Sequence, residues 1–219
     1  MNRRILVFEV FLIVAALVAA VVAYPHLPSQ IATHWGTNMQ ADGYSGRTAV
    51  FWLGPGLMSG LVLFTRFGRW LSPARYSVSS FDATWQRLML FVFCLMAACF
   101  GVMLWSALGH TFDAGRVLAG VFCLFIVLFG NLLGKVRPNF FLGIRTPWTL
   151  ASESVWIATH RFAAWIVVLS GVCGLALVLA GRPQWSLLPV VFALVLSAGY
   201  SLVLYKQTVQ SEQQPAVHP

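Results

Sequence analysis

A polar, aromatic-rich segment between residues 131 and 161 carries the side chains with the greatest capacity for chemistry, and two long apolar runs enclose it. Glu153 and His160 could act as a general acid or base, and Arg145 could bind a phosphate. Glu153, Trp156 and His160 share one helical face at i, i+3 and i+7. We therefore expect the specific activity of the protein to depend on this segment. Its candidate functional residues are Asn131, Asn139, Gly143, Arg145, Thr146, Pro147, Trp148, Glu153, Trp156, His160 and Arg161.

Two interpretations of this segment stay open from the sequence. Glu153 and His160 are separated by about 10 Å along a helix axis, so they cannot bind one metal ion together. The HExxH spacing of zinc proteases is also absent, and neither a metal nor a cofactor is predicted. The alternative to a functional site is an interfacial helix whose tryptophans anchor it and whose arginines contact lipid phosphates. That alternative explains Glu153 and the Gly143–Arg145 turn poorly.

A second candidate region lies between residues 25 and 48, where His26, His34 and Asp42 are potential metal ligands. Their spacing in an irregular loop fits no strict metal motif, so no metal site is predicted. One alternative is a packed cap over the helices, within which His34 forms a hydrogen bond. Another is a surface that meets a peptide arriving from outside. His34 and Asp42 are the candidate functional residues of this loop.

Composition identifies the elements that must position these side chains. Hydrophobic residues make up 59% of the chain and charged residues 9%, against about 25% charged residues in soluble domains. Long apolar runs without period-2 alternation indicate membrane-spanning helices and not a β-barrel. The predicted fold class is all-α, a polytopic membrane protein with six transmembrane helices. The six runs are Ile5–Tyr24, Ala49–Phe67, Leu88–Leu108, Val117–Leu133, Phe162–Ala180 and Trp185–Tyr205.

Basic residues predict the orientation of these spans. Eleven lysines and arginines fall on the side of both termini, and three, Arg47, Arg116 and Arg182, fall on the other. Because positive charge is enriched in cytoplasmic segments, both termini are predicted to be cytoplasmic. The net charge of +8 then reflects attraction to the phospholipid bilayer, not direct binding of nucleic acid.

Helix signals predict a short interfacial helix before the fifth span. Thr146 is a good N-cap, and Pro147 suits the first helical position. A helix from Pro147 to Ala180 has 34 residues and would be roughly 51 Å long, which exceeds the hydrocarbon core. Its first turns must therefore lie in the interface or bend there. Trp148 and Trp156 suit the headgroup region.

The chain is expected to divide into three units. They are a two-helix hairpin with its outside loop at residues 1–70, a four-helix domain at residues 88–206, and a disordered tail at residues 207–219. Glu9 lies about 6 Å inside the first span. An intramembrane carboxylate is a functional candidate, but so shallow a depth favours snorkelling to the interface.

A family resemblance rests on the run GIRTPWTLASESVWIATHR, which Asn131 and Asn139 precede. This run resembles the signature of the SdpI-type bacteriocin-immunity family. The resemblance covers Val117 to about Gly181, and its motif is long and specific.

The outside loop supports the same resemblance. Its sequence PHLPSQIATHW, followed by Asp42, is similar to a membrane domain of unknown function that commonly precedes the immunity domain. The pattern departs at Ala32, where proline is usual, and at Met39, where glycine is usual. The resemblance implies a multi-spanning bacterial membrane protein. The named archetype protects its producer from a secreted toxic peptide and can hold a transcriptional repressor at the membrane.

The function that these observations favour is immunity to, or sensing of, a membrane-active peptide. The expected partners are the bilayer, that peptide and a cytoplasmic transcriptional regulator. The alternative is an inner-leaflet enzyme or small transporter acting on a lipid or small molecule, with Glu153 or His160 as acid or base. Because no nucleophile–base pair has recognisable spacing, binding is favoured over catalysis. We also expect Arg145 and Glu153 to be coupled, since an interfacial carboxylate needs a partner.

Overall fold

Six long helices dominate the computed structural model, which describes residues 3–71 and 76–213. Each is long and apolar enough to cross a membrane, so the predicted all-α class with six spans is confirmed. The helices that form the spans are α1 (Arg3–Ala23), α2 (Ala49–Phe51) with α3 (Leu57–Leu71), α4 (Asp82–Ala107), α5 (Ala114–Leu133), α7 (Glu153–Leu179) and α8 (Leu188–Gln213).

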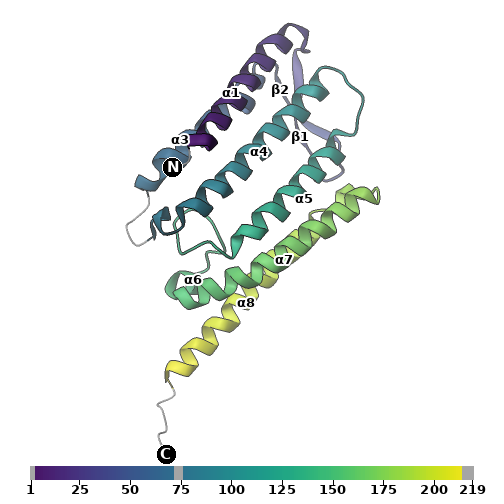
Figure 1. The fold of residues 1–219 in the computed structure, drawn as a ribbon. Coiled ribbons are helices and arrows are strands. Elements are labelled where there is room, and N and C mark those ends of the chain that lie inside the picture. The colour runs from purple at the N-terminus through teal and green to yellow at the C-terminus, as the bar shows by residue number, and fades with distance from the viewer. Residues whose placement is uncertain (1–2, 72–75, 214–219) are drawn as a thin grey trace, which may run out of the picture.

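The helices are arranged in a row, in which α4 packs on α1 and α3, α5 on α4, α7 on α5, and α8 on α7 (Figure 1). The most extensive packing in the row is between α5 and α7. The first turn of α1 and the last turn of α8 lie at the same end of the helices as the loop before α7, and we call this the terminal end (Figure 1). Opposite it is the hairpin end, where two short strands lie.

The two strands correct the prediction of an irregular outside loop. β1 (Gln30–Trp35) and β2 (Ala41–Gly46) pair antiparallel, with an irregular register around His34. The buried Ile31 fixes β1 to the helices, because β1 packs against α4. This hairpin was not evident from the sequence because β2, apart from Tyr44, is made of small and polar residues, most of which are poor strand formers.

A π-helical turn, Trp52–Gly56, interrupts the second span around Pro55. Pro55 lacks the N–H that a regular α-helix would use, which explains why the turn widens there. The turn brings Gly54 so close to the ring of Phe100 in α4 that any Cβ at position 54 would overlap the ring. Glycine therefore permits the close approach of the second and third spans.

The interfacial helix before the fifth span is present as α6 (Pro147–Ala151). A break at Ser152, whose φ of −132° and ψ of 122° are extended, separates it from α7. The long helix expected from Pro147 to Ala180 thus bends at Ser152. A bend was one of the two ways in which a helix of that length could fit the membrane. At the other terminus, α8 continues to Gln213. The predicted disordered tail is therefore helical at residues 207–213, because the last span simply extends beyond its apolar run, and residues 214–219 lie outside the described part.

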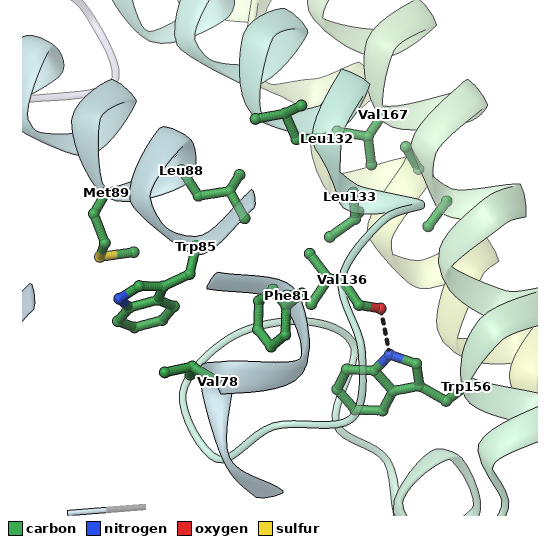
Figure 2. Close-up of a cluster of buried hydrophobic side chains, with 12 residues drawn as sticks. Val78, Phe81, Trp85, Leu88, Met89, Leu132, Leu133, Val136, Trp156 and Val167 are labelled. Carbon is green, nitrogen blue, oxygen red and sulfur yellow. Dashed lines mark hydrogen bonds between the residues drawn. The ribbon is translucent and has the colours of Figure 1, made fainter. Parts of the chain in front are cut away.

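Buried side chains form two clusters, one at each end of the row. The cluster at the hairpin end joins α1, β1, α3 and α4, and includes Ala20, Ile31, Met58 and Phe93. The cluster at the terminal end joins α4, α5 and α7 through Trp85, Leu132, Val136, Trp156 and others (Figure 2). The second cluster supports the segment that the sequence singled out.

Candidate functional site

The backbone of Ile144 is held on both sides by buried side chains. His160 Nε2 accepts a hydrogen bond from the Ile144 N–H at 3.0 Å, and Thr149 Oγ1 donates one to the Ile144 carbonyl at 2.8 Å. His160 and Thr149 are 0% and 1% exposed. The residues from Arg137 to Thr146, which we call the signature loop, are thus fixed in the middle by residues of α6 and α7.

Both nitrogens of His160 are engaged. An N–H group can only donate, so Nε2 must be the acceptor for Ile144, and Nδ1 then carries the proton. Nδ1 lies 2.8 Å from the carbonyl oxygen of Trp156, one turn earlier in α7, to which it donates. The ring also stacks on Trp156, with 4.1 Å between ring centroids. His160 is therefore held as a neutral imidazole with no nitrogen left for a substrate or a metal.

Gly143 allows the signature loop to pass over this histidine. Its φ of +118° lies in a region that only glycine adopts readily. A Cβ placed there would lie 2.5 Å from His160 Nε2 and 3.1 Å from the Trp156 ring. Backbone conformation and space therefore both require glycine at this position.

Asn139 organises the first half of the signature loop. Its side-chain nitrogen donates to the carbonyl oxygens of Arg137 and Leu142, at 2.9 and 2.8 Å. Its side-chain oxygen accepts from the N–H groups of Phe141 and Leu142, both at 2.8 Å. With 0% exposure and a saturated amide, Asn139 acts on the conformation of the loop itself.

The second half of the signature loop ends in a capping box. Thr146 Oγ1 accepts from the N–H of Thr149, and Thr149 Oγ1 accepts from the N–H of Thr146. Pro147 occupies the first position of α6, as predicted. Trp148 then fixes α6 to α8, because its Nε1–H donates to the hydroxyl of Ser201.

Trp156 is buried within the protein and is not an exposed anchor for lipid headgroups, which corrects the expectation that it would contact them. It is 0% exposed, and its Nε1–H donates to the carbonyl oxygen of Val136 at 2.8 Å (Figure 2). The break at Ser152 explains the difference, because it lets α7 begin anew at an angle that directs Trp156 into the bundle. The side chain therefore links α7 to the end of α5.

The exposed side chains of the segment are those that could meet a partner. The guanidinium of Arg145 lies over the ring of Phe140, with 5.1 Å between Arg145 Cζ and the ring centroid. Glu153 lines a polar hollow of ≈ 350 Å³ beside Arg137. Throughout residues 3–71 and 76–213, no hydrogen bond or ion pair joins Arg145 to Glu153, so the expected coupling is not found. Asn131 and Arg161 are exposed on α5 and α7.

At the hairpin end, the exposed side chains of His34 and Asp42 form a hydrogen bond across the two strands, between Nδ1 and Oδ1. Asp42 also lies so close to Gly36 that a Cβ there would overlap its carboxylate. In the part of the chain that is described, no group of three His, Cys, Asp or Glu side chains is placed to hold a metal ion.

Sequence reasoning missed two polar arrangements. Thr149 was not a candidate, although its spacing from Thr146 is that of a capping box. Glu9 does not snorkel: it is 3% exposed, and its Oε2 lies 3.4 Å from Nη2 of Arg66 in α3. The position of Glu9 inside a span was the sequence signal for this pair, because a carboxylate there needs a partner.

Comparison with known proteins gives matches in two separate parts of the chain. Residues 135–206, which contain the whole signature loop, α6, α7 and much of α8, match the SdpI/YfhL protein family. Residues 11–59, which contain the β-hairpin, match the Domain of unknown function (DUF1648). A similar curated protein is the immunity protein SdpI of Bacillus subtilis (strain 168), 22% identical over 165 residues, which are 75% of this chain and 77% of that protein. No solved structure matches.

Proposed function

We propose that this chain, whose residues 135–206 match the SdpI/YfhL protein family, confers immunity to a secreted, membrane-active toxic peptide. We further propose that it resides in a bacterial cytoplasmic membrane with the terminal end inside. The signature loop would then serve as the surface that communicates with a cytoplasmic regulator. The similarity to an immunity protein over three quarters of the chain carries this proposal.

The geometry of the signature loop supports a role in binding. Asn139, Thr149 and His160 are buried, and all three form hydrogen bonds to the loop backbone. Arg145 and Phe140 remain on its surface as a stacked cation and ring. A preorganised loop that presents a cation over an aromatic ring loses little conformational entropy when a partner binds.

The enzyme alternative receives less support from the same residues. His160 was its candidate acid or base, but both of its nitrogens are used within the protein. Glu153 is exposed, and it lines a hollow with one arginine. A general base must reach the proton that it removes, and a buried, saturated imidazole cannot do so.

A survival assay tests the proposal. The gene is expressed in a toxin-sensitive strain that is challenged with a panel of secreted membrane-active peptides, and survival is normalised to the amount of protein in the membrane. The wild-type chain should protect against at least one peptide, and Arg145→Ala should reduce that protection at equal abundance. Arg182→Ala, an exposed arginine at the hairpin end, is the matched control and should protect fully.

Two results would contradict the proposal. Absence of protection against every peptide, with the protein present in the membrane, would overturn immunity as the function. Full protection by Arg145→Ala would leave immunity in place but remove the signature loop from it. Co-purification of a cytoplasmic protein with the wild-type chain, but not with Arg145→Ala, would support the signalling role.

A further inference from the structure

A polar hollow of ≈ 680 Å³ lies at the terminal end, away from the signature loop. The last turns of α3 form one wall, and the 3₁₀ turn Val78–Phe81 with the first turn of α4 forms the other. Trp70 and Phe67 on the α3 side are 72% and 51% exposed. Because exposed aromatic residues at the end of a span mark the lipid headgroup level, the hollow opens where headgroups are found.

A guanidinium and an indole are among the hydrogen-bond donors of the residues that line this hollow. Arg66 contributes a guanidinium, whose bond to Glu9 is the one hydrogen bond that it makes within the described chain. Trp85 contributes an indole, 2% exposed, whose Nε1–H has no hydrogen-bond partner among the described residues. Figure 2 shows this nitrogen on the side of the ring that faces away from Phe81 and Val136. A buried indole N–H normally has a partner, so an acceptor is missing here.

Charge restricts what that acceptor can belong to. Arg66 is already paired with Glu9, and Asp82 adds a carboxylate to the lining of the hollow. Asp82 is exposed and accepts a hydrogen bond from Gln86 within its own helix. An anion bound by Arg66 and Trp85 would therefore lie close to a second carboxylate. A group with both an anionic and a cationic end satisfies both sides of the hollow.

We propose that this hollow binds the headgroup of a phospholipid that carries both a phosphate and a primary ammonium group, as phosphatidylethanolamine does. Arg66 and the Trp85 N–H donate to the phosphate oxygens, and Asp82 accepts from the ammonium. The hydroxyls of Ser77 and Ser79, which bond to each other at the mouth, supply further polar contacts. This site is independent of the proposed immunity function.

Native mass spectrometry of the full chain in detergent tests the proposal. The protein is offered equal amounts of phosphatidylethanolamine and phosphatidylglycerol, and the lipid that stays bound is counted. Wild type should retain the ethanolamine lipid preferentially. Trp85→Phe keeps the ring but removes the donor, and should lower this retention about fivefold, the value of one hydrogen bond. Trp165→Phe, an exposed tryptophan on α7, is the matched control and should change nothing.

Further measurements distinguish a lipid headgroup from free phosphate as the ligand, and exclude misfolding as the cause of lost binding. Asp82→Asn should abolish the preference for the ethanolamine lipid over the glycerol lipid. Displacement of the lipid by inorganic phosphate alone would overturn the assignment to a zwitterionic headgroup. In wild-type protein, the indole ¹H–¹⁵N signal of Trp85 should shift on addition of the ethanolamine lipid. An unshifted signal, or equal retention of both lipids by wild type, would overturn the site.

Discussion

Asn139 holds four backbone groups of the signature loop at once, and no other residue type offers two donors and an acceptor oxygen in so short a side chain. Together with Gly143 and His160, it converts an irregular segment into a fixed one. The sequence could single out these residues because amide, glycine and imidazole are unusual beside a span. It could not predict that Gly143 and His160 touch, since their contact depends on the bend at Ser152.

Loss of the Asn139 amide should destabilise the protein. Asn139→Ala leaves several buried backbone groups without partners, and is expected to lower the free energy of unfolding by about 3 kcal/mol. Chemical unfolding of the protein in detergent measures this change. Asn131→Ala, at an exposed position of α5, is the control and should have little effect. Equal stability of the two variants would show that water replaces the amide.

Gly143→Ala should be more damaging than the same change at Gly181. Both glycines have positive φ, +118° and +74°, but a Cβ at Gly181 meets nothing within 4 Å. Gly181→Ala is expected to cost about 1 kcal/mol for its backbone conformation. Gly143→Ala should cost roughly 3 kcal/mol, because its methyl group also collides with His160. Equal losses in the melting temperature would contradict the close approach of loop and histidine.

At the scale of elements, α6 is the part that connects the signature loop to the last span. Its cap residues were predicted from the sequence, because Thr-Pro is a local signal. Its contact with α8 was not predicted, because Trp148 and Ser201 are 53 positions apart in the sequence. The β-hairpin was missed for a different reason, since its strands lack the alternation of apolar residues by which strands are recognised.

A double-mutant cycle tests whether α6 is fixed to α8. Trp148→Phe removes the indole donor, and Ser201→Ala removes its acceptor. The two changes should couple by about 1 kcal/mol in the free energy of unfolding, the usual value of such a bond. The pair Trp165→Phe and Ser201→Ala, which share no hydrogen bond, should be additive. Additivity in both pairs would show that α6 docks without this bond.

At the scale of the whole molecule, the row of helices separates two buried clusters at opposite ends, and α4 contributes to both. Apolar runs predicted the six spans, since length and hydropathy alone decide whether a helix can cross a bilayer. The order of helices in the row could not be predicted, because it depends on close approaches at glycines. Gly171 and Gly130, for example, bring α7 and α5 together.

The two ends of the row should lie on opposite sides of the membrane, with the terminal end in the cytoplasm. The asymmetry of eleven basic residues against three motivates this expectation. Reporter enzymes that are active on only one side of the membrane, fused at Gln210 and inserted at Asn38 in the hairpin, measure it. Opposite signals are expected. Signals from the same side would contradict an even number of spans.

An open row has a longer perimeter than a closed bundle of the same helices. Within the described chain, α8 packs extensively only on α7 and the short α6, so its remaining surface is left to lipid. Large exposed apolar side chains such as Phe192, Val195 and Val203 follow that surface. A change in bilayer thickness acts on every lipid-facing helix through hydrophobic mismatch. A protein of this shape is therefore exposed to a change in membrane thickness along most of its length, and the helix with the most lipid-facing surface, α8, is bonded through Ser201 to Trp148 of α6, directly after the signature loop.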